Sequence, residues 1–213
     1  IRADLRGAKI HKADLEEVDL TTTLVTGASF TRVLFEGARA AGVDFTGCDL
    51  TDSTFDEVDL RGAVLAGTSA GQASFVKAKL DGAKLQRIDA PSCDFKDASL
   101  EKADLREANL AESSFDGASL KGALGDRANL QGARFRRADM RGVTLRSAIL
   151  TYANLSHARL EQANLEGADL EQANLHRALK NSAILRGCNL KNVSETDPEL
   201  AHAEDFDPRR VGG

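Results

Sequence analysis

A five-residue repeat without interruption is the feature of this sequence that most narrows its possible folds. From Ala3 to Asn192 the chain spans 190 residues, which divide into 38 consecutive units of five. The third position of each unit is mostly Leu or Phe and the first mostly Ala, whereas the fourth and fifth are polar, charged or Gly. Helices repeat apolar residues every 3.6 positions and strands every 2. A period of five therefore indicates a chain that turns once per unit and stacks into a solenoid.

The spacing of the phenylalanines predicts how many units close one coil. The chain has nine Phe, and six of them lie at intervals of twenty residues: Phe35, Phe55, Phe75, Phe95, Phe115 and Phe135. Four units per coil would stack these six as an interior ladder, extended at its ends by Leu15, Leu155 and Leu175. The same arithmetic stacks a second ladder on the next side: Leu60, Leu80, Leu100, Leu120, Met140 and Leu160. Successive coils should lie about 4.8 Å apart, as neighbouring β-strands do.

Units such as ADLRG (3–7), ADLRE (103–107) and ANLEG (163–167) resemble the A(D/N)LXX tandem repeats of the pentapeptide-repeat family. The resemblance implies an all-β fold, a right-handed quadrilateral parallel β-helix (solenoid) of about 9–10 coils of 20 residues. We expect this β-helix over residues 1–193. A short C-terminal helical cap and tail should occupy residues 194–213, because Thr196-Asp197-Pro198-Glu199 is typical of a helix start.

Three places depart from the pattern of interior residues. Gly125 takes a third position directly after Leu124, and we expect Leu124 to lean inward there. Lys180 takes a third position near the end of the repeat, where either a degenerate terminal unit keeps its ammonium in water or a cation pocket forms. Ala70 and Ala90, one coil apart, predict a thin stretch of core that either bends the rod slightly or opens a ligand cleft.

The sequence carries no signature of an enzyme: no phosphate-binding loop, no nucleophile elbow and no pair of cysteines at metal-ligand spacing. We therefore expect no catalytic residue, no cofactor and no metal site. Cys48, Cys93 and Cys188 all fall on inward first positions, which indicates small buried side chains without disulfides. His157 and His176 share an outer face in neighbouring coils, but without nearby carboxylates they predict solvated surface.

Charge is distributed unevenly over one side of the predicted solenoid. We define the Phe-ladder face as the outward second, fourth and fifth positions of the units that supply the Phe ladder and its Leu extensions. Its N-terminal part is acidic and its C-terminal part is basic. The candidate interaction surface consists of Glu16, Glu17, Glu36, Asp56, Glu57, Asp94, Asp97, Asp116, Arg134, Arg136, Arg137 and Arg177. Such a dipolar face can orient a protein partner, and an ordinary solvated face is the alternative.

These observations favour a non-catalytic rigid scaffold or protein-interaction module. The alternative that the family resemblance implies is a DNA-mimicking inhibitor or modulator of DNA gyrase or another topoisomerase. A net charge of −5 argues against direct nucleic-acid binding, and no apolar run approaches the roughly 18 residues of a membrane span.

The repeat is already in frame at Ala3. We therefore expect one domain of a larger bacterial protein, located in the bacterial cytoplasm or secreted as an effector. Its protein partner is unknown. An uncapped N-terminal coil would also allow end-to-end self-association, because open coil ends leave strand edges unpaired.

Overall fold

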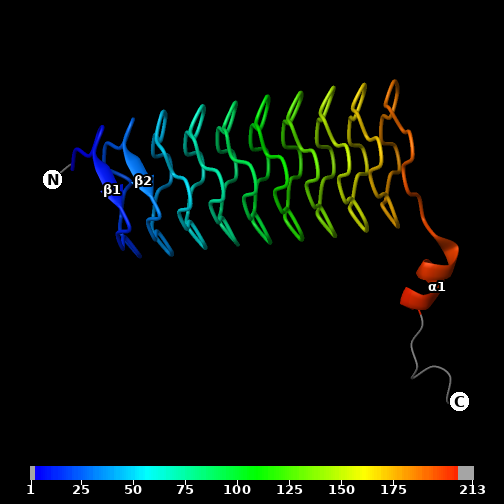
Figure 1. Ribbon diagram of the computed structural model, residues 1–213, viewed down its shortest axis with the longest axis horizontal. Helices are drawn as coiled ribbons and strands as arrows, with labels where there is room; N and C mark the ends of the chain where they lie inside the picture. The colour runs from blue at the N-terminus through cyan, green and yellow to red at the C-terminus, as the bar shows by residue number, and fades with distance from the viewer. Residues whose placement is uncertain (1–2, 206–213) are drawn as a thin grey trace, which may run out of the picture.

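The computed structural model describes residues 3–205. Within them the chain winds into a rod of stacked coils, and one helix, α1 (Pro198–Asp205), follows the last coil (Figure 1). Regular strands are short: β1 (Lys9–His11) and β2 (Ser29–Thr31) pair in parallel, with Lys9 opposite Ser29. The other pairings are single parallel bridges between residues twenty positions apart, from Asp4–Leu24 to Asn174–Ser194. The predicted coil of twenty residues is therefore confirmed.

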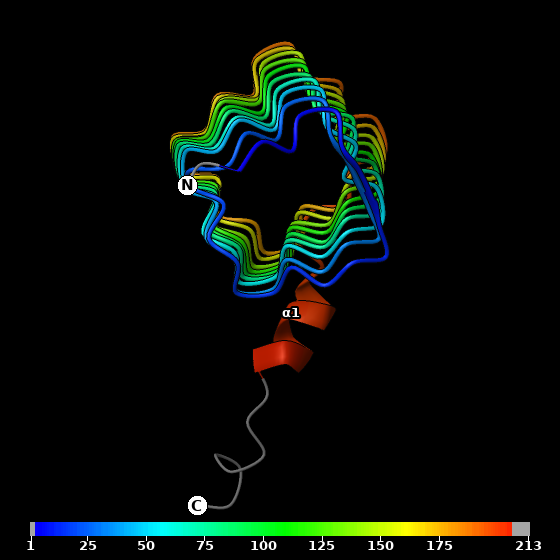
Figure 2. The same cartoon turned by 90° about the vertical axis from the view of Figure 1, so that its left-hand side faces the viewer.

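Backbone hydrogen bonds join each coil to both of its neighbours in a fixed pattern. The third-position N–H donates forward, as from Phe75 to the carbonyl oxygen of Asp94 (2.7 Å). The second-position N–H donates backward, as from Asp94 to the carbonyl oxygen of Ala73 (3.1 Å). The turn between two units is closed by the first-position N–H of the second unit, as from Ala78 to the carbonyl oxygen of Phe75 (3.0 Å). Figure 2 shows the result as coils that superpose around a common interior.

The turn that ends each unit places its fifth position in the left-handed backbone region. Every fifth position from 7 to 192 has a φ between 53° and 74°, with the exception of Thr22. Glycine enters this region without steric cost, whereas a branched Cβ fits it worst. Thr22 is the β-branched residue among the fifth positions, which explains why the exception falls there.

The interior contains the predicted ladders. All six rings of the Phe ladder are fully buried, and neighbouring centroids lie 4.6–5.2 Å apart with interplanar angles of 2–15°. The aliphatic ladder from Leu60 to Leu160 is buried as well. At Ala70 and Ala90, polar side chains of the next coil bond to the inner backbone: Cys93 Sγ donates to the carbonyl oxygen of Ala70 (2.9 Å) and Ser113 Oγ to that of Ala90 (3.1 Å).

The expectation that Leu124 leans inward is wrong. Its side chain is 38% exposed, because the backbone keeps its register and Leu124 bridges to Asp104 and Thr144 as other second positions do. The space left by Gly125 is instead approached by Leu145, whose Cδ2 would lie 2.8 Å from a Cβ added at Gly125. The glycine is therefore accommodated by the next coil and not by its own neighbour in sequence.

Lys180 keeps its ammonium outside the coil, as the interpretation of a degenerate terminal unit requires. Its Nζ donates to both carboxylate oxygens of Glu195, at 2.7 and 2.5 Å. The ion pair forms between the last coil and the segment that leads to α1. The charge of Lys180 is thus neutralised at the surface and does not enter the core.

The expected C-terminal helix is present, but it lies beside the last coils and not across their open end (Figure 2). Asp197 begins it as an N-cap, with Oδ1 accepting from the N–H groups of Glu199 (2.9 Å) and Leu200 (3.1 Å). Leu190, a third-position residue of the last coil, remains 47% exposed. Over residues 3–205 no helix has the length and apolar character needed to cross a membrane.

Candidate interaction surface on the Phe-ladder face

The twelve candidate interaction residues all lie on the outside of the rod, either exposed or half-buried. Their common side follows from the pairing of residues twenty positions apart, which aligns outward positions of successive coils in columns. Asp94, for example, bridges to Ser74 and Ser114 on the two adjacent coils. The structure therefore brings the candidates together as one strip along the rod, in the order in which they occur in the sequence.

The acidic part of the strip is only partly neutralised. Glu57 Oε1 accepts from Lys77 Nζ at 3.0 Å. Asp56 Oδ1 accepts from Ser74 Oγ (2.5 Å) and from the N–H of Val76 (2.9 Å), so its carboxylate also ties one coil to the next. Glu16, Glu17 and Glu36 form no ion pair within residues 3–205. The N-terminal end of the face therefore presents free negative charge to solvent.

A groove of about 780 Å³ lies where the acidic part of the face meets the basic part. Small side chains shape it, because Ser114, Gly117 and Ser156 occupy outward positions that carry long side chains in other coils. A Cβ at Gly117 would collide with the carboxylate of Asp97. Glycine at this position therefore permits Asp97 to lie along the groove.

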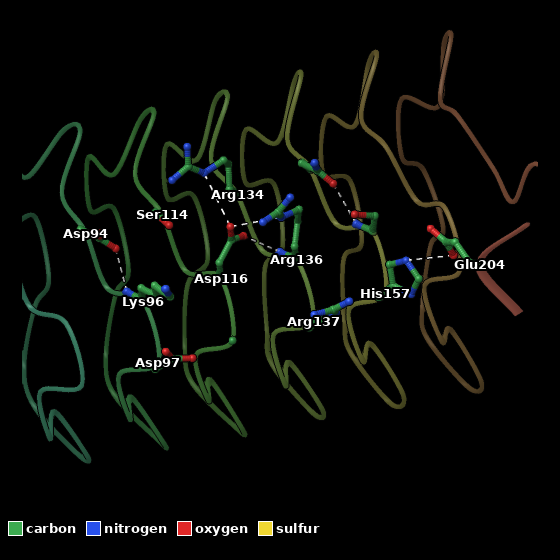
Figure 3. Close-up of a pocket in the computed structure, with 13 residues that line it drawn as sticks. Asp94, Lys96, Asp97, Ser114, Asp116, Arg134, Arg136, Arg137, His157 and Glu204 are labelled. Carbon is green, nitrogen blue, oxygen red and sulfur yellow. Dashed lines mark hydrogen bonds and ion pairs between the residues drawn. The ribbon is translucent and has the colours of Figure 1, made fainter. Parts of the chain in front are cut away.

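Arginines and one carboxylate define the centre of the groove (Figure 3). Asp116 accepts from Arg136 Nε at 3.2 Å and from the Arg136 N–H at 2.9 Å, and its ion pair with Arg134 Nε measures 3.9 Å. Arg137 forms no ion pair among the described residues and points along the groove toward His157 in Figure 3. Lys96 also lines the groove and forms no ion pair among the described residues, so two cations are available to a ligand, beside two that Asp116 already orients.

Helix α1 closes the C-terminal end of the groove with a carboxylate that the repeat pattern does not contain. Glu204 Oε2 lies 3.4 Å from His157 Nε2, 3.4 Å from His176 Nε2 and 3.3 Å from Arg177 Nη1. Burial raises the pKa of Glu204, but the hydrogen bond from His176 and the charges of the two histidines outweigh it and hold the pKa below its ordinary value. The premise that no carboxylate lies near the two histidines is therefore wrong.

The cysteines have the inert environment expected of small interior residues. Cys48 and Cys93 are buried as expected, whereas Cys188 is only half-buried, and all three thiols are free. Burial raises the pKa of Cys48 to about 11 and that of Cys93 to about 12. Burial also raises the pKa of Cys188. At neutral pH these groups are therefore thiols, which are poor nucleophiles.

A four-sided parallel β-solenoid with a packed apolar interior and a charged, grooved exterior is the architecture of a repeat protein, in which each coil contacts only its neighbours. The family model of pentapeptide repeats matches the chain in eight copies, over residues 1–21, 28–67, 59–97, 93–124, 103–142, 126–162 and 153–194. The chain belongs to the pentapeptide repeat family. Its fold is accordingly the right-handed β-helix that this family forms, as the sequence resemblance implies.

The chain is similar to several solved structures at low sequence identity. QnrB1, described as a plasmid-mediated fluoroquinolone resistance protein, is 16% identical over 100% of this chain and 97% of that chain, with a TM-score of 0.62. HetL, described as involved in heterocyst differentiation regulation in the cyanobacterium Nostoc sp. strain PCC 7120, is 28% identical over 86% of this chain and 87% of that chain, with a TM-score of 0.37.

A pentapeptide repeat protein from the Arabidopsis thaliana thylakoid lumen is 28% identical over 46% of this chain and 69% of that chain, with a TM-score of 0.43. No curated protein matches the sequence. The likeness to QnrB1 is evidence for the fold alone, because fold and function separate readily in a family of repeat scaffolds.

Proposed function

We propose that the protein is a rigid, non-catalytic scaffold that binds a protein partner through its Phe-ladder face. The observation that carries this proposal is the reversal of charge along that face. Glu16 and Glu17 stand unpaired toward one end, and Arg136 and Arg137 stand toward the other, with the groove at the transition. A partner of complementary charge would meet a surface that fixes both its position and its direction.

The rigidity of the rod supports its proposed role as a scaffold. Each coil is held to the next by the same backbone bonds, so charges on successive coils keep a fixed spacing, as the 4.8 Å between the centroids of Phe75 and Phe95 indicates. Complementary charge on a rigid surface accelerates the encounter with a partner and suppresses wrong orientations, more than it adds affinity. The groove also provides a concave site that could partly enclose a side chain of the partner.

Two glutamates provide a matched pair of substitutions. Glu57 and Glu107 both occupy fifth positions, with φ of 61° and 59°. Glu57 pairs with Lys77 at 3.0 Å and Glu107 with Arg87 at 2.8 Å. Their units are separated by two sides of the four-sided coil, so that Glu57 lies on the Phe-ladder face and Glu107 on the opposite one.

The test begins with cross-linking of the full chain in bacterial lysate and identification of the bound protein by mass spectrometry. Association rates to that protein are then measured at low and moderate salt. Glu57→Lys should slow association and reduce its salt dependence, while Glu107→Lys should leave both unchanged. Equal effects of the two substitutions, or no effect of either, would reject the Phe-ladder face as the binding surface.

The alternative function, DNA mimicry toward gyrase, is favoured by the acidic N-terminal part of the same face. Duplex DNA carries one charge per about 1.7 Å, which corresponds to about three charges for each coil of 4.8 Å. The coil that carries Asp14, Glu16 and Glu17 reaches this density, but the next coil offers only Glu36 on this face. A supercoiling assay with purified gyrase separates the two functions: salt-sensitive inhibition would replace the scaffold proposal with DNA mimicry.

A further inference from the structure

Three metal-ligating side chains from different parts of the chain converge at the C-terminal end of the groove. His157 and His176 belong to neighbouring coils, and Glu204 belongs to α1. One potential ligand atom of each lies within 4.8 Å of the others. The imidazole rings stand edge to face, with centroids 5.6 Å apart, so that both can direct a nitrogen to one point. Figure 3 shows His157 facing Glu204 across this end of the groove.

The two distances from Glu204 Oε2 to the histidine nitrogens match ligands of one ion better than hydrogen-bond partners. Charge-assisted N–H···O bonds measure about 2.7–2.9 Å, whereas both Nε2 atoms lie 3.4 Å from Glu204 Oε2. Zinc holds imidazole nitrogen and carboxylate oxygen at about 2.0–2.2 Å in a tetrahedron, whose edges are then about 3.4 Å long. We propose that His157, His176 and Glu204 bind a zinc ion, with the fourth coordination position open toward the groove.

The fold positions two of the ligands before any ion arrives. His176 is only 6% exposed. Its backbone N–H donates to Asn174 Oδ1 at 2.9 Å, which holds the backbone from which the imidazole extends. The N–H of His157 donates to the carbonyl oxygen of His176 at 2.8 Å, so that the two ligands move as one unit. Glu204 lies on α1, which is capped at Asp197 about two turns earlier.

Two groups compete with the ion. The N–H of Asp197 donates to His176 Nδ1 at 3.2 Å, so without an ion the neutral ring carries its proton on Nε2, toward Glu204. Zinc on Nε2 moves that proton to Nδ1 and breaks the bond from Asp197. Arg177 Nη1 lies 3.3 Å from the same oxygen, Glu204 Oε2, and its charge repels a cation. Without an ion, Glu204 therefore contacts His157, His176 and Arg177, and bound zinc would replace these contacts.

The ligand set also determines which ions fit. Two imidazoles and one carboxylate suit zinc and other late first-row divalent ions, whereas Mg²⁺ and Ca²⁺ prefer sites made of oxygen alone. Bound zinc would link α1 covalently through coordination bonds to the last coils, and its open position would accept a donor from a ligand in the groove. This inference stands independently of the proposed scaffold function.

Zinc binding is tested by calorimetric titration of the full, untagged chain, with Co²⁺ absorption as a report of tetrahedral coordination. We expect one zinc per chain and no competition from Mg²⁺ or Ca²⁺. His157→Gln and Glu204→Gln should each weaken binding at least about tenfold. Gln is already present at the fifth positions 162 and 172 with φ of 62° and 59°, so the first substitution suits its backbone.

Matched controls are His11→Ala, at the far end of the rod, and Glu199→Gln, in the first turn of α1. Neither should change zinc affinity, and Arg177→Gln should increase it by removing the competing charge. Circular dichroism establishes that every variant is folded. Absence of saturable binding at millimolar zinc, or equal affinity in the wild type and in both ligand variants, would overturn the proposal.

Discussion

Removing one ring from the middle of the Phe ladder should destabilise the rod strongly. Phe95 is fully buried, and its ring is nearly parallel to those of Phe75 and Phe115, at 2° and 4.8 Å in both directions. Phe95→Ala would leave a cavity bounded on two sides by these rings. The backbone on either side is fixed by its bonds to the adjacent coils, such as the Phe95 N–H to the carbonyl oxygen of Ser114 (2.7 Å), so the cavity cannot collapse easily.

The magnitude follows from two contributions. Burial of a Phe side chain is worth about 1.5–3 kcal/mol. Each stacked aromatic pair adds about 0.5–1.5 kcal/mol, and Phe95 takes part in two. Together these give a loss of about 4 kcal/mol in the free energy of unfolding, within the range of about 3–5 kcal/mol typical of Phe→Ala in a core.

Urea titration followed by circular dichroism measures this loss, with Phe95→Leu as the matched control. Leu already occupies this ladder at Leu155 and Leu175, both buried, so the control keeps apolar burial and loses only the ring contacts. Its cost should be about 1–2 kcal/mol. The ladder interpretation would be refuted by a loss below about 1 kcal/mol for Phe95→Ala, or by equal losses for the two variants.

Three further outcomes are expected. Gly142→Ala should lower the free energy of unfolding by about 1–2 kcal/mol in a urea titration. Its φ is +65° and no atom lies within 4 Å of the added Cβ, so the loss comes from backbone strain alone. Gly142→Asn should lose less, and equal losses for the two variants would contradict this explanation. The raised pKa values of Cys48 and Cys93, about 11 and 12, exceed the unfolded value of 9.0. Their contribution to stability is complete below pH 9.0 and is lost as the pH rises through 11 and 12, so the wild type should weaken more steeply in alkali than a Cys48→Ala/Cys93→Ala variant. Glu57→Lys should change the free energy of unfolding by no more than about 0.5 kcal/mol, since the residue is exposed; an unfolded variant would contradict its outward placement.

Most of the fold could be predicted from the sequence because each structural requirement recurs in every unit. One phenylalanine indicates little, but six at intervals of twenty determine the size of the coil, and the stacked rings from Phe35 to Phe135 confirm it. For Leu124 the prediction from the sequence is wrong. The displaced leucine suggested a local inward turn, whereas the backbone register of the neighbouring coils outweighs the preference of a single apolar side chain.

The candidate surface was predictable to a similar degree. The outward placement of residues such as Asp94 and Arg136 follows from position within the unit, so the strip of charge could be found before the groove was known. The position of Glu204 could not be predicted in this way, because Glu204 lies outside the repeat. Its approach to His176 depends on where α1 leaves the last coil. No periodic signal in the sequence records that direction.

The pairing of residues twenty positions apart also determines which insertions and deletions the protein can accept. Loss of a whole coil would shorten the rod and leave every later residue on its original side. Loss of one unit, for example 123–127, would preserve the interior pattern but rotate all later coils by a quarter turn. Arg134 and Arg136 would then move to a different side from Asp94, and the polarity of the surface would be lost while the rod remained folded. Variation among relatives should therefore proceed in steps of twenty residues wherever the two charged regions must act together.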